Sequence, residues 1–339
     1  MNLITTSVLG LAAAAVCIPL FSTKILAGPQ RAGDYTLSGP FTHDNLTVFL
    51  IHGPNRMTRN LLSLEEAIDQ HKVVVFETRN VNELSIENVS SEDVFIESGD
   101  IVKGGAQDRT LKDDLILPAK SGKVNLSAFC VEHGRWTRRG DEPVESFNSA
   151  RQAVATKELK LAVKQKASQT EVWNQVAQAQ DKLSSRLGSG VRAAAAPTSM
   201  SMSMNAPVVQ RSIDGYLQEL SGTVNHKDDV IGFAFSINGK INSGDVYGSH
   251  ELFSKLWMKL LRASAVEAVS EYDADRKFEA ATVSALQATL ADAESGKSTT
   301  REVNDRTTVL AKETVKTLMY ETRDRAQKDA WVHRNYLTK

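Results

Sequence analysis

Strand-like and helix-like segments follow one another along this chain in blocks, without regular alternation. Strand-like runs, rich in Val, Ile and Phe, fill most of the first third and cover residues 45–52, 73–78, 83–89, 93–102, 114–117 and 123–132. Helical patterns follow, and strand-like runs return at residues 307–311, 315–321 and 331–337. Blocks of this kind are typical of α+β domains. We predict one large α+β domain over residues 28–339, with mixed, mainly antiparallel sheets.

Two local signals fix turns and helix starts in this scheme. Asn238-Gly239 lies between strand-like runs at residues 230–237 and 240–247. An Asn-Gly pair in this setting is the strongest short-range signal for a β-hairpin. Ser63 begins a Ser-x-x-Glu pattern, which is typical of the capping box at a helix N-terminus.

Residues 188–210 are rich in Ala, Ser, Gly and Met and contain few large aliphatic side chains. This composition predicts a mobile low-complexity loop. Within it, Met200, Met202 and Met204 alternate with serine, a pattern that resembles the thioether-rich stretches that bind copper(I). No His or Cys lies close by in the sequence, so we favour a flexible spacer.

The N-terminal segment is apolar enough to direct export. Residues 3–21 carry no charged side chain, a proline ends the run, and small residues follow at Ala27-Gly28. This layout predicts a signal peptide over residues 1–27, cleaved near Ala27, and a secreted or periplasmic protein. The alternative is an uncleaved N-terminal membrane anchor, because the apolar run approaches the length that spans a bilayer.

Charge and cysteine content exclude several classes of function. The formal net charge is -1, so nothing in the sequence attracts the chain to nucleic acid. Cys130 is the only cysteine beyond the predicted signal, so no internal disulfide can form and the fold must be held by its core. The strand-like surroundings of Cys130 favour a buried, unreactive thiol over a nucleophile.

Common catalytic signatures are missing from the sequence. It contains no GxxxxGK[ST], HExxH, CxxC or GxSxG motif, and no GxGxxG follows a strand-like run. The sequence identifies no cofactor and no metal ligands, and whether the chain is an enzyme stays open.

The first candidate for ligand binding is a glycine pair followed by polar side chains. Gly104 and Gly105 allow positive φ angles, which turn backbone N–H groups towards one point, as in anion-binding nests. Gln107 adds an amide, and Arg109 adds a guanidinium suited to carboxylate or phosphate. The alternative is a tight turn in which Arg109 and Asp108 neutralise each other.

The second candidate follows the strand-like run at residues 123–132. Glu132 and His133 are side chains suited to acid–base catalysis. Arg135 could hold an anion, and Trp136 offers a stacking face. The alternative is a strand end in which Glu132 pairs with Arg135. Because sequential strands tend to be neighbours, we expect the two candidate segments to lie side by side.

At these two segments the chain resembles a bacterial family of unknown function, the ARG and rhodanese-phosphatase-superfamily-associated protein domain. The resemblance runs from about Leu46 to the last strand-like run. It rests on Leu64 to Ala67, Gly99 to Gly105, Gln107, Arg109, Cys130 to Trp136, Val172-Trp173, Asp245 to Gly248 and Leu252 to Leu261. Asp100 stands where the family usually has Glu, and His133 where it usually has Gln. Through its named associations, the resemblance implies a link to ADP-ribose or phosphoester metabolism.

Two functions follow from these observations. In the first, an exported domain binds or processes an anionic small molecule of nucleotide-sugar or phosphoester type. Glu132 and His133 would then act on the ligand, and Gly104, Gly105, Gln107, Arg109, Arg135 and Trp136 would bind it. In the second, the protein is a non-enzymatic extracytoplasmic interaction or scaffold protein. Neither function involves nucleic acid, or a membrane once the signal is removed.

Overall fold

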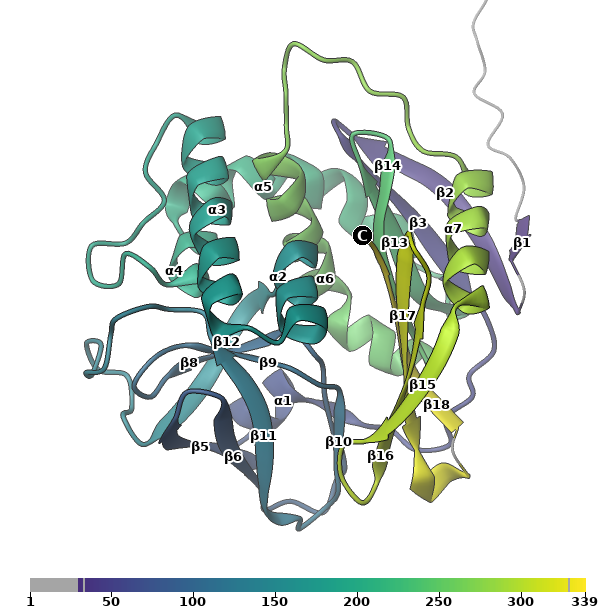
Figure 1. The fold of residues 1–339 in the computed structure, drawn as a ribbon. Coiled ribbons are helices and arrows are strands. Elements are labelled where there is room, and N and C mark those ends of the chain that lie inside the picture. Colours follow the sequence, from purple (N-terminus) through teal and green to yellow (C-terminus); the bar gives the residue numbers. More distant parts are fainter. Residues whose placement is uncertain (1–29, 33, 329) are drawn as a thin grey trace, which may run out of the picture.

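A nine-stranded sheet forms one part of the protein (Figure 1). The structure, a computed structural model, describes residues 30–32, 34–328 and 330–339, so the predicted signal lies outside the described residues. The strand order is β1-β2-β3-β13-β14-β18-β17-β16-β15, and all neighbouring strands are antiparallel. The strands are β1 (Gln30–Ala32), β2 (Tyr35–His43), β3 (Leu46–His52), β13 (Val230–Ile237), β14 (Lys240–Tyr247), β15 (Lys297–Glu302), β16 (Thr307–Glu313), β17 (Thr317–Asp324) and β18 (Ala330–Thr338).

A closed barrel and a small sheet form the other β-rich part. The barrel order is β11-β6-β5-β12-β8-β9, and the small sheet has the order β10-β7-β4, in which only β4 and β7 are parallel. The barrel strands are β5 (Val73–Asn80), β6 (Glu83–Asn88), β8 (Asp100–Gly104), β9 (Arg109–Leu111), β11 (Gly122–Cys130) and β12 (Ser146–Val154). The small sheet contains β4 (Leu62–Ser63), β7 (Val94–Ile96) and β10 (Leu115–Leu117). The barrel therefore comes from one continuous stretch of chain, whereas the large sheet combines distant segments.

Helices fill the space between these two parts. The longest, α6 (His250–Ser270), contacts both β12 of the barrel and β13 of the large sheet (Figure 1). The other helical elements of this part are α1 (Leu64–Asp69), α2 (Lys157–Leu161), the π-helix η1 (Ala162–Lys166), α3 (Gln169–Leu187), α4 (Met200–Met204), α5 (Pro207–Leu220) and the short 3-10 turn η2 (Ser221–Val224). Of these, α3 and α5 pack against α6. One apolar cluster joins these helices to the inner face of the large sheet.

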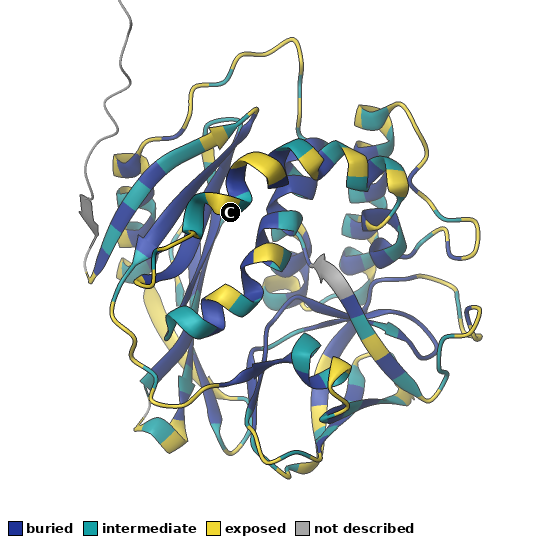
Figure 2. Ribbon diagram, turned by 180° about the vertical axis from the view of Figure 1, so that it is seen from behind, coloured by how far each residue is buried: buried dark blue, intermediate teal, exposed yellow. Residues whose placement is uncertain are grey.

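The opposite face of the large sheet is covered by α7 (Val283–Ser295), and a short 3-10 turn, η3 (Arg325–Gln327), precedes β18. Figure 2 shows buried residues along the large sheet and exposed residues along the outer loops. Among the described residues, no helix is both long and apolar enough to cross a membrane. The prediction of a single α+β domain with mainly antiparallel sheets is confirmed.

The two local signals also agree with the structure. Asn238 and Gly239 have φ angles of 53° and 77°, and they join β13 to β14 as the predicted hairpin. Positive φ at both turn positions matches the right-handed twist of the two strands. The Ser63 hydroxyl accepts the Glu66 N–H, and the Glu66 carboxylate accepts the Ser63 N–H. The capping box therefore begins α1 as expected.

The sequence analysis merged two strands into one and missed another. The run at residues 93–102 forms two strands, β7 and β8, because a polar turn at residues 97–99 separates them. The alternating pattern of β2 is interrupted by Gly39-Pro40, where the register with β3 shifts. Proline cannot donate a ladder hydrogen bond, so it sits at such an irregularity and hides the strand from pattern analysis.

The prediction of a mobile loop over residues 188–210 is wrong for its C-terminal half. Residues 200–204 form α4, whose N-cap is Ser199, and α5 begins at Pro207. Met200 and Met204 are 1% and 2% exposed and belong to the main apolar cluster. An alternating Met-Ser pattern looks like a polar spacer, but in a helix residues four apart share one face. The flexible thioether chains then fill the core.

Truncation of these buried methionines should destabilise the protein. We expect Met200→Ala and Met204→Ala each to lower the free energy of unfolding by about 2–5 kcal/mol, because each leaves a cavity in a packed core. Urea denaturation followed by circular dichroism measures the loss. The matched control is Met202→Ala on the half-buried face, for which we expect a change within about 1 kcal/mol. Equal, small losses for all three variants would contradict the packing of α4.

Candidate functional site

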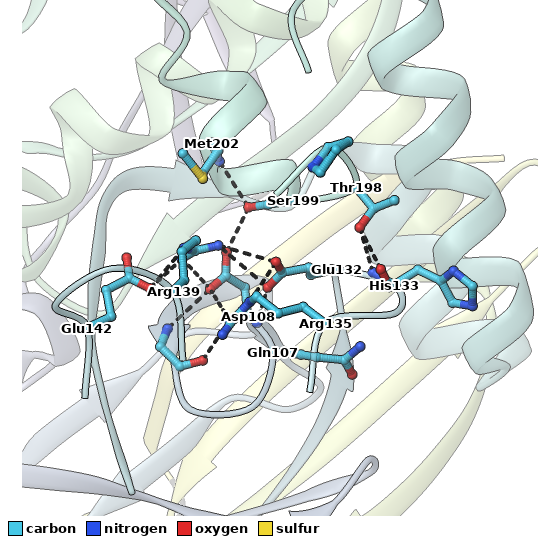
Figure 3. Close-up of polar contacts among 12 residues, drawn as sticks. Gln107, Asp108, Glu132, His133, Arg135, Arg139, Glu142, Thr198, Ser199 and Met202 are labelled. Atoms are coloured by element: carbon cyan, nitrogen blue, oxygen red, sulfur yellow. Dashed lines mark hydrogen bonds and ion pairs between the residues drawn. The ribbon is translucent and has the colours of Figure 1, made fainter. Parts of the chain in front are cut away.

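The two candidate segments lie side by side, as predicted. Strand β9 pairs with β11, so that Arg109 faces Cys130 in the register. The Val131 N–H donates to the Asp108 carbonyl at 3.0 Å, and the Asp108 N–H donates to the Glu132 carboxylate at 3.0 Å. Figure 3 shows Asp108 of the first segment beside Glu132 and Arg135 of the second, whereas Gln107 and His133 point away from them.

The glycine pair presents its polar groups to the protein itself. The Gly104 N–H donates to the Asp108 carboxylate at 3.1 Å. The Gly104 and Gly105 carbonyls accept the Arg135 guanidinium at 3.1 Å each. A Cβ atom at Gly105, where φ is 51°, would lie 2.3 Å from the Phe147 ring. Glycine is therefore needed here for a close approach, and the two N–H groups bond to different acceptors, Gly104 to the Asp108 carboxylate and Gly105 to backbone carbonyls, so they form no nest around one anion.

Buried ion pairs complete this network (Figure 3). The Arg135 Nε donates to Glu132 Oε1 at 2.7 Å. Arg139, which sequence analysis did not single out, donates to both oxygens of Asp108 at 2.8 and 3.1 Å. The Ser199 hydroxyl donates to Asp108 Oδ2 at 2.8 Å and also caps α4. Glu132 and Asp108 are fully buried, so the network links the barrel end to α4.

The remaining predicted residues point in other directions. Arg109 is fully buried, with its guanidinium 3.6 Å from Glu77 of β5. Gln107 is fully buried as well, and its amide has no hydrogen-bond partner among the described residues. His133 is exposed and packs its ring against Trp173 at 4.3 Å, while Trp136 is 53% exposed. The segments are adjacent, but their functional groups do not share one orientation.

The Cys130 thiol lies buried in β11. Burial raises its pKa to about 11, so little thiolate forms near neutral pH. This environment is that of an unreactive core thiol.

The Glu132–Arg135 pair should contribute mainly to stability. Arg135→Ala would remove the closest cation of the buried Glu132 carboxylate, so we expect the free energy of unfolding to fall by about 3 kcal/mol. The matched control is Arg138→Ala, because Arg138 and its partner Asp141 are both exposed. We expect the control to change stability by no more than about 0.5 kcal/mol. A loss below about 1 kcal/mol for Arg135→Ala, in urea denaturation, would instead favour a ligand-binding role.

A second group of polar side chains lies buried where the barrel meets the large sheet. It consists of Glu97, Asp114, Asp245 and His333, and we call it the junction cluster. Its members are 1–3% exposed. Glu97 lies between β7 and β8 and Asp114 just before β10, whereas Asp245 belongs to β14 and His333 to β18. The cluster therefore joins three separate sheets.

His333 is held from both sides of its ring. Its Nδ1 lies 2.7 Å from Asp114 Oδ2, and its Nε2 lies 3.2 Å from Asp245 Oδ1. The Asp114 carboxylate also accepts the Thr322 hydroxyl at 2.6 Å and the Ser98 N–H at 2.8 Å. The ring orientation of His333 is thus fixed by a hydrogen-bonded carboxylate.

Burial and close charges shift the ionisation of this cluster. Burial alone would lower the pKa of His333, but Asp114 and Asp245 outweigh it and raise the pKa to about 9. Burial opposes ionisation of Asp114, yet His333 outweighs it and holds that pKa well below its usual range. Burial raises the pKa of Glu97 to about 7, against a smaller effect of Lys160. Strongly shifted ionisable groups are frequent in functional sites.

The helix layer supplies cations to this junction. From α2, Lys160 places its ammonium 3.8 Å from Glu97 Oε1. From α6, Lys259 bonds to Asp100, the residue that begins β8. Tyr247 stacks on His333 with 4.5 Å between ring centroids. Charged and aromatic groups from all layers therefore surround the cluster.

A cavity of about 100 Å³ lies beside Asp114. It is lined by Lys112, Asp113, Asp114, Lys164, Arg301, Val309, Tyr320 and Thr322. We call it the cationic cavity because three of these side chains are basic. Arg301 is bonded to Asp113. Grooves of about 890 and 730 Å³ lie elsewhere, but no residue of the junction cluster lines either one.

Lys164 reaches the cationic cavity from an unusual element. It belongs to the π-helix η1, which ends at Ala167 with a φ of 47°. π-Helical turns are rare and often occur at functional sites. The Lys164 ammonium lies 4.3 Å from the centre of the Tyr320 ring and forms no ion pair with any residue that the structure describes. Burial lowers the pKa of Lys164.

Sequence analysis missed the junction cluster because its members are far apart in the chain. One signal was available: Asp245 and His333 each interrupt a strand of buried residues. An ionisable residue on the buried face of a strand needs a partner, so it marks a polar site.

Comparison with known proteins gives a family. The family model of the ARG and Rhodanese-Phosphatase-superfamily-associated Protein domain matches residues 34–337. No curated protein and no solved structure matches the chain.

Proposed function

Since the chain belongs to the ARG and Rhodanese-Phosphatase-superfamily-associated Protein domain family, whose name assigns no activity, we propose a function from the geometry. We propose that the protein binds an anionic small molecule and that the anionic group of this ligand enters the cationic cavity. The observation that carries the proposal is the convergence of Lys112, Lys164 and Arg301 on one small cavity. Asp113 and Asp114 also line the cavity, so its basic side chains exceed its acidic ones by one, and a net positive lining attracts anions.

The acidic side chains of the cavity are already paired, whereas one of its lysines forms no ion pair in the part of the chain that the structure describes. Arg301 is bonded to Asp113, and Asp114 is bonded to His333, so the two acidic side chains already have partners. Lys164 is partly buried without an ion pair among the described residues. An anion beside Lys164 would stabilise the ammonium form, whose pKa burial otherwise lowers.

The size of the cavity limits what it can enclose. Ligand pockets for whole drug-sized molecules measure about 300–1,000 Å³. A cavity of about 100 Å³ holds about three water molecules, or one compact group of similar size. It therefore fits a phosphate or carboxylate group, with the rest of the ligand outside. A phosphate-bearing ligand also agrees with the phosphatase association in the family name.

Phosphate binding tests this proposal. We expect inorganic phosphate or AMP to raise the melting temperature of the full chain, at constant ionic strength and in the presence of EDTA. Loss of a charge-assisted hydrogen bond costs about 1.5–3 kcal/mol. Lys164→Met should therefore weaken the apparent Kd roughly ten- to a hundredfold. The stabilisation of the wild-type chain by phosphate should weaken in alkaline solution, because burial makes Lys164 lose its proton at a lower pH than an ordinary lysine.

The matched control is Lys316→Met, which removes an exposed lysine from the turn between β16 and β17. This variant should retain the rise in melting temperature that phosphate causes in the wild type. If neither phosphate nor AMP stabilises the wild-type chain, anion binding is wrong and the alternative of an interaction or scaffold protein is favoured.

We also propose that the protein is exported, on the strength of the apolar N-terminal segment alone. The signal would be removed near Ala27, with the body folding in a secreted or periplasmic location. Intact-mass analysis of the protein from its producing cell should show a chain lacking residues 1–27. Retention of the apolar run would contradict cleavage and support the membrane anchor.

A further inference from the structure

We propose that Glu97, Asp245 and His333 bind a divalent transition-metal ion, Zn²⁺ or Mn²⁺, which joins the barrel to the nine-stranded sheet. The ligand atoms of these three side chains lie within 4.8 Å of one another. Of these atoms, His333 Nε2 and Asp245 Oδ1 are 3.2 Å apart. Ligand atoms about 2.0–2.2 Å from a shared zinc ion have separations of this order.

His333 has the orientation that a metal ligand requires. Its Nδ1 is hydrogen-bonded to Asp114, so in the neutral form that binds a metal, with the proton on Nδ1, the lone pair of Nε2 is directed at Asp245. A carboxylate that accepts the second N–H of a ligating histidine is the usual support for such a ligand. Asp114 is itself fixed by Thr322 and Ser98.

Unpartnered polar atoms around the three side chains point to a missing ligand. Glu97 is 1% exposed, yet neither of its carboxylate oxygens has a hydrogen-bond partner among the described residues. The nearest ammonium, of Lys160, is 3.8 Å from Oε1, beyond hydrogen-bond distance. Leaving a buried carboxylate in this state is costly. A metal ion would satisfy it.

Two residues that contact this set carry further unpartnered oxygen atoms. Tyr247 Oη and Asn335 Oδ1 are buried and lack a hydrogen-bond partner in the described part of the chain. Tyr247 stacks on His333, and Asn335 donates its amide N–H to Asp245 at 2.6 Å. Four protein ligands in a closed, buried site are typical of structural rather than catalytic metal centres.

The donor set selects the metal. Imidazole suits zinc, whereas carboxylate oxygens also suit manganese, so a mixed set favours Zn²⁺ or Mn²⁺ over Mg²⁺ and Ca²⁺. The alternative is a metal-free network in which a protonated His333 bridges Asp114 and Asp245. That arrangement satisfies His333 but leaves Glu97 with no cation within hydrogen-bond distance among the described residues.

This inference does not depend on the proposed anion binding. The cationic cavity adjoins Asp114, which contacts Nδ1 of His333. The proposed metal site lies on the other side of the ring, where Nε2 faces Asp245. Phosphate-dependent stabilisation in EDTA and metal uptake without phosphate therefore report on separate sites.

Metal uptake by the full chain tests the inference. The protein is dialysed against EDTA and then given Zn²⁺ or Mn²⁺ alone, with Mg²⁺ as a comparison. We expect about one bound Zn²⁺ or Mn²⁺ per chain by elemental analysis after desalting. We also expect the melting temperature to rise by roughly 5 °C at a hundredfold excess over Kd. Co²⁺ in place of Zn²⁺ should give a visible spectrum that reports direct ligation.

Glu97→Gln keeps the size of the side chain but removes its charge, so it should weaken metal binding roughly tenfold or more. The matched control is Asp324→Asn, a buried carboxylate of the same large sheet that is paired with Arg306. The control should bind metal as the wild type does. If Glu97→Gln fails to fold, the metal content of the wild-type chain and its Co²⁺ spectrum test the inference instead. Substoichiometric uptake by the wild type, or unchanged uptake by Glu97→Gln, would overturn the inference.

Discussion

The contact between His333 and Asp114 connects the two halves of the protein. His333 belongs to β18 in the large sheet, and Asp114 precedes β10 beside the barrel. Ionised groups are costly to bury, so these two side chains are stable in the interior only when they face each other. The relative position of barrel and sheet is therefore tied to a specific polar contact as well as to apolar packing. Apolar surfaces alone would allow the barrel to shift along the large sheet, whereas the contact between His333 and Asp114 favours one relative position.

The helix layer depends on the same constraint. Lys160 and Lys259 extend from α2 and α6 towards carboxylates at the junction. Lysine is rarely buried unless it is paired, so these residues specify where each helix must lie. The π-helix η1 follows α2 directly and carries Lys164 to the neighbouring cavity. A polar interior thus positions elements that apolar contacts would leave less well defined.

Sequence reasoning recovered features that depend on neighbouring residues. The hairpin at Asn238-Gly239, the capping box at Ser63 and the meeting of the Gly104 and Glu132 segments all follow from local turns or adjacent strands. It could not recover the junction cluster, because Glu97 and His333 meet only through tertiary packing. It also misjudged Met200, since composition alone does not reveal which face of a short helix is buried. Local chemistry was predictable, and long-range pairing of charges was not.

The place of β18 in the large sheet affects how the chain can fold. β18 pairs with β14 on one side and β17 on the other, so it lies inside the sheet although it is formed by residues 330–338. A nascent chain that has not yet reached these residues lacks an interior strand, and β14 and β17 have no common neighbour. Contacts between residues so distant in sequence make folding slow. Assembly of the complete sheet must therefore wait until residues 330–338 have been synthesised, which leaves β14 with an open edge until then.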